Sequence, residues 1–198
     1  MDNKIRITIL GLGHVGLPTA LGFAQIGWEV IGTDNDLDKL DLISEGVVPF
    51  YEPGISEMLK KYLRQGNFKV EKNQSQAIKD AQCIFVCVGT PQNSDGSADL
   101  SQLETVAKTI AENISGYKLI VEKSTTPVTT AANLRLSIQR HIDTRIKKQG
   151  KASDDFEFDV AVNPEFLKEG TAISDFMCPD RIVVGVDNEK SRQLLKAI

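Results

Sequence analysis

Three glycines near the N-terminus restrict what this chain can fold into more than any other feature. An apolar run at residues 5–10 leads into Gly11, and Gly13 and Gly16 follow in the spacing G-x-G-x-x-G. From residue 17 to 26 apolar residues recur at helical intervals, so the glycines lie on a turn between a strand and a helix. In that context Gly11 permits a tight turn, Gly13 lets the backbone approach a pyrophosphate, and Gly16 lets the helix pack closely on the strand. The sequence therefore predicts an anion-binding helix N-terminus.

A carboxylate completes this pattern. Asp34 follows a second apolar run, residues 28–31, about 20 positions beyond the glycines. A carboxylate at the end of the second strand can accept both hydroxyls of an adenosine ribose and would repel a 2′-phosphate, so the sequence predicts NAD rather than NADP. Lys39 is close enough to weaken that preference slightly. The alternative, an ordinary loop acid beside ordinary turns, is disfavoured because strand, glycines, helix, strand and acid follow in order.

Strands and helices alternate along the rest of the chain. Apolar runs predict strands at 68–70, 83–88, 119–121, 158–162 and 181–186. Helical periodicity predicts helices at 37–44, 55–63, 74–79, 100–114, from 127 to about 146, and from 188 onward. This alternation predicts an α/β fold, a doubly wound and mainly parallel sheet in a three-layer αβα arrangement, typical of a Rossmann-type NAD-binding domain. We expect that domain to span residues 1–186, and residues 187–198 to begin a helix leading to a central or C-terminal segment that the chain lacks.

Composition excludes several classes of partner. The net charge of −4 offers no broad basic surface for nucleic acid, and no apolar run approaches the roughly 20 residues of a membrane helix. The N-terminus has no signal-peptide layout. Cys83 and Cys87 stand four positions apart in a strand-like run, which separates their Cα atoms by about 13 Å, too far for a disulfide. We therefore expect reduced thiols and a cytoplasmic protein. No pattern predicts a metal site.

Five polar segments begin where predicted strands end: the glycine turn, Asp34, and residues 89–91, 124–126 and 163–170. Ligands of parallel α/β sheets bind beyond the carboxyl ends of the strands, so these segments should line one cleft. Within them Glu165 is a candidate base for the hydroxyl proton that is lost when an alcohol gives up a hydride. On the residues alone, a capping acid for a short helix after Pro164 is an equal alternative. Thr125 has a similar alternative as an N-cap, and its two roles can coexist.

Six segments in a fixed order carry a family resemblance: GLGHVGLPTA (11–20), GVVPFYEPG (46–54), FVCVGTP (85–91), VEKSTTPV (121–128), NPEFLKEGTAISDF (163–176) and PDRIVVG (179–185). Together they resemble the N-terminal NAD-binding domain of the UDP-glucose/GDP-mannose 6-dehydrogenase family, and their sequences are most similar to its UDP-glucose branch. The resemblance implies a nucleotide-sugar substrate and oxidation of the C6 alcohol of UDP-glucose to UDP-glucuronate with two NAD. It also implies a homodimer for the full-length protein. Alternatives are a GDP-mannose or UDP-N-acetylmannosamine 6-dehydrogenase domain and a non-catalytic NAD-sensing domain.

The resemblance also implies roles for individual residues. Cofactor contacts are implied at Gly11, Gly13, His14, Val15, Gly16, Asp34, Lys39, Thr90, Thr125 and Glu169. Substrate contacts are implied at Glu165, Phe166, Leu167 and Lys168. Glu165 would manage protons at the reacting carbon through a water that Thr125 helps to hold, so these two are the implied catalytic residues. His14 stands where the family commonly has tyrosine, and we expect its ring to pack beside the pyrophosphate.

The resemblance places the family's cysteine nucleophile, with its lysine and asparagine partners, beyond residue 198. None of the three cysteines here matches it: Cys83 and Cys87 lie in a strand predicted to be buried, and Cys178 matches no nucleophile of the family. We therefore expect this chain to bind NAD and to leave the sugar unoxidised on its own.

Overall fold

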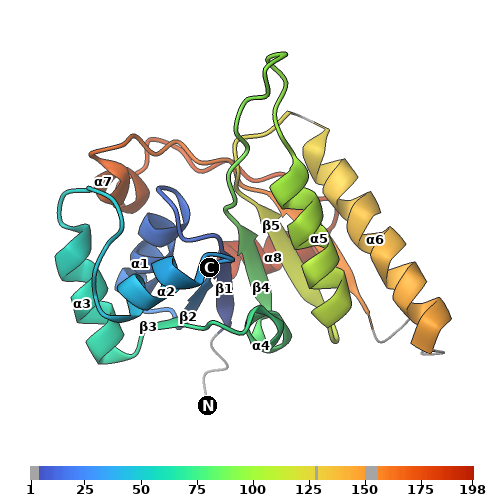
Figure 1. Ribbon diagram of the computed structural model, residues 1–198, viewed down its shortest axis with the longest axis horizontal. Helices are drawn as coiled ribbons and strands as arrows, with labels where there is room; N and C mark the ends of the chain where they lie inside the picture. Colours follow the sequence, from blue (N-terminus) through green and yellow to red (C-terminus); the bar gives the residue numbers. More distant parts are fainter. Residues whose placement is uncertain (1–4, 128, 150–155) are drawn as a thin grey trace.

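Six parallel strands form the single sheet of this computed structural model, which describes residues 5–127, 129–149 and 156–198 (Figure 1). The strands are β1 Ile7–Leu10, β2 Val30–Thr33, β3 Phe68–Val70, β4 Cys83–Val86, β5 Lys118–Glu122 and β6 Phe158–Val162. They pair in the order β3-β2-β1-β4-β5-β6, and all five pairings are parallel. The order reverses direction between β1 and β4, which is the topological switch point where such sheets bind ligands.

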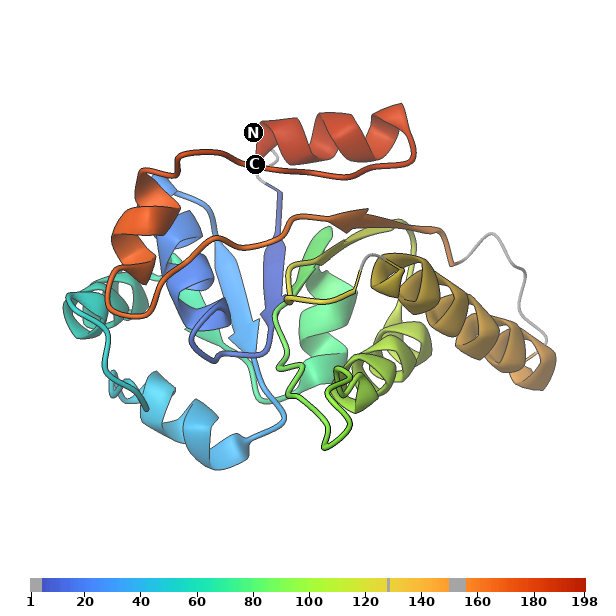
Figure 2. The same cartoon turned by 90° about the horizontal axis from the view of Figure 1, so that it is seen from above.

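Helices cover both faces of the sheet and complete the three layers. They are α1 Gly16–Ile26, α2 Leu37–Ser44, α3 Ile55–Gln65, α4 Gln74–Asp80, α5 Ser101–Asn113, α6 Thr130–Gln149, α7 Ala172–Met177 and α8 Glu189–Ala197. One buried cluster joins the sheet to α1, α2 and α3, and side chains of α7 and α8 pack against it. The other joins the opposite face to α4, α5 and α6. Figure 2 shows α7 beside α1 on one side of the sheet, and α5 beside α6 on the other. The expected doubly wound αβα fold is confirmed.

The central strands are apolar along their length because both of their faces are covered. In β4, Cys83 and Phe85 enter the α1 cluster, whereas Ile84 and Val86 enter the α5 cluster. All four of these residues are buried. Alternation with a period of two therefore supplies both cores from one short run.

The segment 181–186, expected as a last strand, is not one. Gly185 forms an isolated antiparallel bridge with Val162, with N–O distances of 2.9 and 2.8 Å. The carbonyl of Val183 accepts instead from the side-chain amide of Asn163, at 2.8 Å. Ile182 is 73% exposed, so the β-branched run that predicted a strand crosses the surface as a strap. The short helix α7, Ala172–Met177, was not predicted either. Other errors are shifts of element ends: the helix expected from Pro127 begins at Thr130.

The helix expected from residue 188 is confirmed as α8, whose N-cap Asn188 accepts from the amide of Ser191 at 2.9 Å. Leu194, Leu195 and Ile198 pack against the α1 cluster. Trp28 Nε1 donates to the carbonyl of Ile198 at 3.2 Å, so the last residue of the chain is tied to the domain. None of the helices among the described residues is both long and apolar enough to cross a membrane.

Candidate functional site

The glycine turn connects β1 to α1 at the carboxyl edge of the sheet. Gly11 has a φ of 93°, and a Cβ there would lie 2.7 Å from the carbonyl oxygen of Cys87. A Cβ on Gly16 would lie 1.8 Å from the carbonyl oxygen of Gly11. Gly13 differs, because a Cβ there would meet no atom within 4 Å. Gly11 and Gly16 are therefore required by the fold, and Gly13 leaves open space in front of the helix.

That space faces a helix end that can take an anion. Val15 occupies the N-cap of α1 and makes no side-chain capping hydrogen bond. The first turn of a helix leaves amides without intrahelical partners, and the helix dipole favours negative charge there. The open position at Gly13 and the uncapped N-terminus of α1 therefore fit a pyrophosphate.

Asp34 lies directly after β2, at the same edge, and is 6% exposed. Its Oδ2 accepts from the amide of Leu12 at 2.7 Å and from Lys39 Nζ at 3.0 Å. Its Oδ1 accepts from the amide of Asp36 at 3.1 Å. The carboxylate is thus fixed against the glycine turn, as a ribose-binding acid must be, and Lys39 partly neutralises it.

His14 projects from the glycine turn and packs on a second segment, the turn 46–54. Its ring lies 4.3 Å from that of Phe50, centroid to centroid, at an angle of 32° between planes. The ring is therefore held against Phe50 beside the glycine turn, and its place beside a pyrophosphate stays a prediction.

Thr90, Thr125 and Glu165 come from the ends of three neighbouring strands and meet in one hydrogen-bonded series. Thr90 Oγ1 donates to the carbonyl of Thr125 at 2.7 Å. Thr125 Oγ1 donates to Glu165 Oε1 at 3.1 Å, and Glu165 Oε2 accepts from the amide of Leu167 at 2.6 Å. Both oxygens of the candidate base are therefore oriented by donors. Since β2 and β6 run parallel in one sheet, Glu165 lies at the same edge as Asp34.

The structure also bears on the alternatives for these residues. The backbone at 163–168 is not helical, so Glu165 does not cap a helix after Pro164. Its bond to Leu167 orders a loop instead. Thr125 lies five positions before α6 begins at Thr130 and is not its N-cap. The catalytic, cofactor and substrate roles themselves stay predictions.

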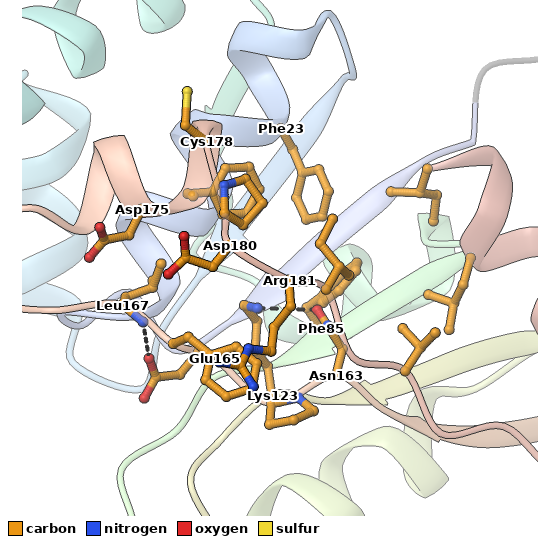
Figure 3. Close-up of a pocket in the computed structure, with 18 of the residues that line it drawn as sticks. Phe23, Phe85, Lys123, Asn163, Glu165, Leu167, Asp175, Cys178, Asp180 and Arg181 are labelled. Atoms are coloured by element: carbon orange, nitrogen blue, oxygen red, sulfur yellow. Dashed lines mark hydrogen bonds between the residues drawn. The ribbon is translucent and has the colours of Figure 1, made fainter.

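A cavity of about 600 Å³ opens beside Glu165 and is lined in part by Arg181, Ile182 and Val184 of the strap 181–186 (Figure 3). Glu165, Phe166, Leu167 and Lys168, the four residues implied to bind substrate, all line it. Phe166 is half exposed, and the guanidinium of Arg181 lies 5.7 Å from its ring centroid. Glu169, implied to lie near the nicotinamide, is exposed on the same loop. The cavity combines apolar walls with a few charged groups, as small-molecule sites do.

Lys123 is a cavity residue that the sequence analysis did not single out. It directly follows β5 and is only 5% exposed, and its Nζ donates to Asn163 Oδ1 at 3.1 Å (Figure 3). Burial lowers the pKa of this ammonium, while Cys87 and Glu165 act in the opposite direction. The sequence did offer a signal for this residue, a lysine in the segment VEKST directly after an apolar run. Lysine at such a position is notable because it is rarely buried unless it is paired.

Cys83 and Cys87 are buried as expected, although Cys87 lies one residue beyond the end of β4. Cys83 and Cys87 are buried free thiols, and Cys178 is an exposed one beside the cavity. Burial raises the pKa of Cys87 to about 12, so it is protonated at neutral pH. Among the residues that the structure describes, no three His, Cys, Asp or Glu side chains are grouped to hold a metal ion.

A parallel sheet in this order, a glycine turn into α1 and an acid after β2 together define an NAD-binding domain of the Rossmann type. The family model described as "UDP-glucose/GDP-mannose dehydrogenase family, NAD binding domain" matches residues 5–198, and the chain belongs to this family. NAD is accordingly the cofactor of the domain.

Known relatives match this chain along nearly its whole length. It is 36% identical over 193 residues to UDP-glucose 6-dehydrogenase TuaD of Bacillus subtilis, a match that covers 98% of this chain and 40% of the relative. The structure resembles a UDP-glucose dehydrogenase from Pyrobaculum islandicum with a TM-score of 0.89 and 33% identity, covering 98% of this chain and 43% of that one. It resembles a GDP-mannose dehydrogenase from Pseudomonas aeruginosa with a TM-score of 0.86 and 35% identity, over 98% and 43% of the two chains. The chain thus spans about two fifths of the length of these relatives.

Proposed function

We propose that this chain is the NAD-binding domain of a UDP-glucose 6-dehydrogenase, which oxidises the C6 alcohol of UDP-glucose to a carboxylate with two NAD. The observation that carries the proposal is the bond between Thr125 and Glu165 at the sheet edge that also holds the glycine turn and Asp34. A base beside a dinucleotide cradle is the arrangement that alcohol oxidation needs.

The proposed roles follow from where the groups lie. The N-terminus of α1 holds the pyrophosphate, and Asp34 holds the adenosine ribose. NAD supplies the hydride acceptor. Glu165, directed by Thr125 and the Leu167 amide, receives the hydroxyl proton of the sugar, either directly or through one water. The 163–168 loop and the cavity beside it receive the sugar end of the substrate.

A GDP-mannose dehydrogenase is the second candidate, because the GDP-mannose dehydrogenase structure is as similar in sequence as the UDP-glucose one, 35% against 33%. The residues that distinguish the two sugars are proposed to lie in the part of the relatives that this chain does not span. A cytoplasmic location, a homodimer of the full-length protein and a division of the chain at residue 186 belong to the same proposal. Buried free thiols support the first of these.

A turnover assay tests the proposal. Purified chain is mixed with NAD and, in separate samples, UDP-glucose, GDP-mannose or UDP-N-acetylmannosamine, and NADH formation is followed. We expect no turnover here, and two NADH per UDP-glucose from the longer protein that includes residues 1–198. A Glu165→Gln variant of that longer protein should lose at least about 100-fold in kcat, the usual contribution of a general base. Preference for GDP-mannose, or turnover by the 198-residue chain alone, would contradict the proposal.

A further inference from the structure

Glu52 is a buried carboxylate that the proposed chemistry does not use. It is 6% exposed and lies in the turn 46–54, far in sequence from the strand ends. Its Oε2 accepts from the amide of Gly170 at 2.8 Å, and its Oε1 accepts from the amide of Ala172 at 2.9 Å. Both carboxylate oxygens thus hold backbone groups more than 100 residues away.

These two amides lie at the C-terminal end of the loop that carries the candidate base Glu165, just where α7 begins. At its near end Glu165 is bound to Thr125, and at its far end Gly170 and Ala172 are bound to Glu52. Gly170 has a φ of 88°, a conformation that a residue with a side chain adopts only under strain. The residues proposed to meet substrate, 165–168, therefore lie between two fixed points.

The turn that carries Glu52 also contacts the cofactor side of the site. Phe50, two positions earlier, packs on His14 of the glycine turn at 4.3 Å between ring centroids. Pro49 and Pro53, which flank Phe50 and Glu52, restrict the backbone of this turn. One short and stiff segment thus touches both the dinucleotide cradle and the base-bearing loop.

We propose that Glu52 is a positioning residue: by clamping the amides of Gly170 and Ala172, it fixes the loop that places Glu165 over the dinucleotide cradle. This rests on the proposed function for what the loop does, although the clamp itself can be measured without any ligand. Glu52 acts through the loop and touches neither substrate nor cofactor.

Hydrogen–deuterium exchange on the intact 198-residue chain tests the proposal. Glu52→Gln keeps the size of the side chain but replaces one acceptor with a donor that faces an amide, so exchange within 163–172 should become about 10-fold to 100-fold faster. Exchange in β5 should not change. Glu57→Gln, an exposed acid on α3, is the matched control and should leave both segments unaltered.

Addition of NADH provides a second readout, which a purely stabilising residue would not move. NADH should slow exchange within 163–172 in the unsubstituted chain, and this protection should disappear in Glu52→Gln while the Kd for NADH stays within about twofold. The proposal is overturned if exchange within 163–172 is unchanged, or if β5 and the loop accelerate together. If NADH binds but protects neither chain although the clamp result holds, the proposed role of the loop at the dinucleotide fails and the loop-clamping role of Glu52 stands.

Discussion

Gly13 and Gly16 stand three positions apart and differ in the space around their Cα atoms. Gly16 has no room for a side chain and is required by the fold, whereas Gly13 has open space that a ligand can use. Gly16→Ala should destabilise the domain by about 3 kcal/mol, because its Cβ would overlap a backbone oxygen that cannot move aside. Gly13→Ala should change the free energy of unfolding by less than about 0.5 kcal/mol, since its Cβ enters open space. It should still weaken NAD binding at least about tenfold, because that space faces the N-terminus of α1.

Urea denaturation and calorimetry with NAD measure the two effects independently. If Gly13→Ala binds NAD as tightly as the unsubstituted chain, the pyrophosphate does not lie over this turn. If Gly16→Ala is as stable as the unsubstituted chain, the close packing of α1 on the turn is wrong.

Asp34 is expected to set the preference between the two dinucleotides. Asp34→Asn removes the charge that repels a 2′-phosphate and leaves Lys39 without its partner at 3.0 Å. The ratio of NADP to NAD affinity should therefore rise at least about tenfold, which direct titration with each dinucleotide measures. Lys72→Met, which breaks an exposed ion pair with Asp41, is a control and should leave the ratio unchanged. An unchanged ratio in Asp34→Asn would show that the acid does not face the ribose.

Glu122 gives the fold a dependence on pH. Burial raises its pKa above the ordinary 4.5, and the hydrogen bond from Thr126 opposes that shift only in part. The folded state therefore holds this proton more tightly than the unfolded chain does. Its contribution to stability is fully present below pH 4.5 and is lost as the pH rises through the folded-state pKa.

Glu122→Gln should remove this dependence while keeping an acceptor for Thr126. The gain in free energy of unfolding relative to the unsubstituted chain should be largest near pH 7 and shrink toward about pH 5. Denaturation curves across that range measure it, with the exposed Glu112→Gln as control. A gain that grows toward acid pH would have the opposite sign and contradict the assignment.

At the scale of elements, α7 packs on α1 through a contact that requires glycine. A Cβ on Gly22 would lie 2.2 Å from the ring of Phe176, whose edge also meets Phe23 at 5.2 Å between centroids. Gly22→Ala should therefore cost about 1–3 kcal/mol of stability, although alanine is otherwise the better helix former.

A double-mutant cycle with Phe176→Leu checks this contact. The cost of Gly22→Ala should fall substantially once the ring is gone, so the two changes should be less than additive. Equal costs in both backgrounds would mean that α7 does not rest on α1 at this point.

Much of the element order could be predicted from the sequence because it is written in local patterns. The glycine spacing, the apolar run of β4 and the capping residue Asn188 each specify structure within a few positions. The segment 181–186 could not be predicted, because its conformation depends on Asn163. The side-chain amide of Asn163 donates to the carbonyl of Val183, which would otherwise be available to a neighbouring strand. The clamp of Glu52 on Gly170 was hidden for the same reason, since 118 residues separate the two.

At the scale of the whole molecule, the parallel sheet brings these distant groups to one edge. Asp34 and Glu165 follow strands near opposite ends of the strand order, and the parallel direction of all six strands places both at the carboxyl side. The resemblance could name the residues of the candidate site, but only the packed chain relates them to one another. The bond of Thr125 to Glu165 and the burial of Lys123 are properties of that packing.

NAD binding at this edge of the sheet can be measured by calorimetric titration of the 198-residue chain with NAD. We expect one saturable site with a Kd between about 1 μM and 1 mM, weaker binding of NADP, and loss of the NAD signal in Gly13→Ala. Absence of any binding heat at several temperatures, or equal binding by Gly13→Ala, would contradict this expectation.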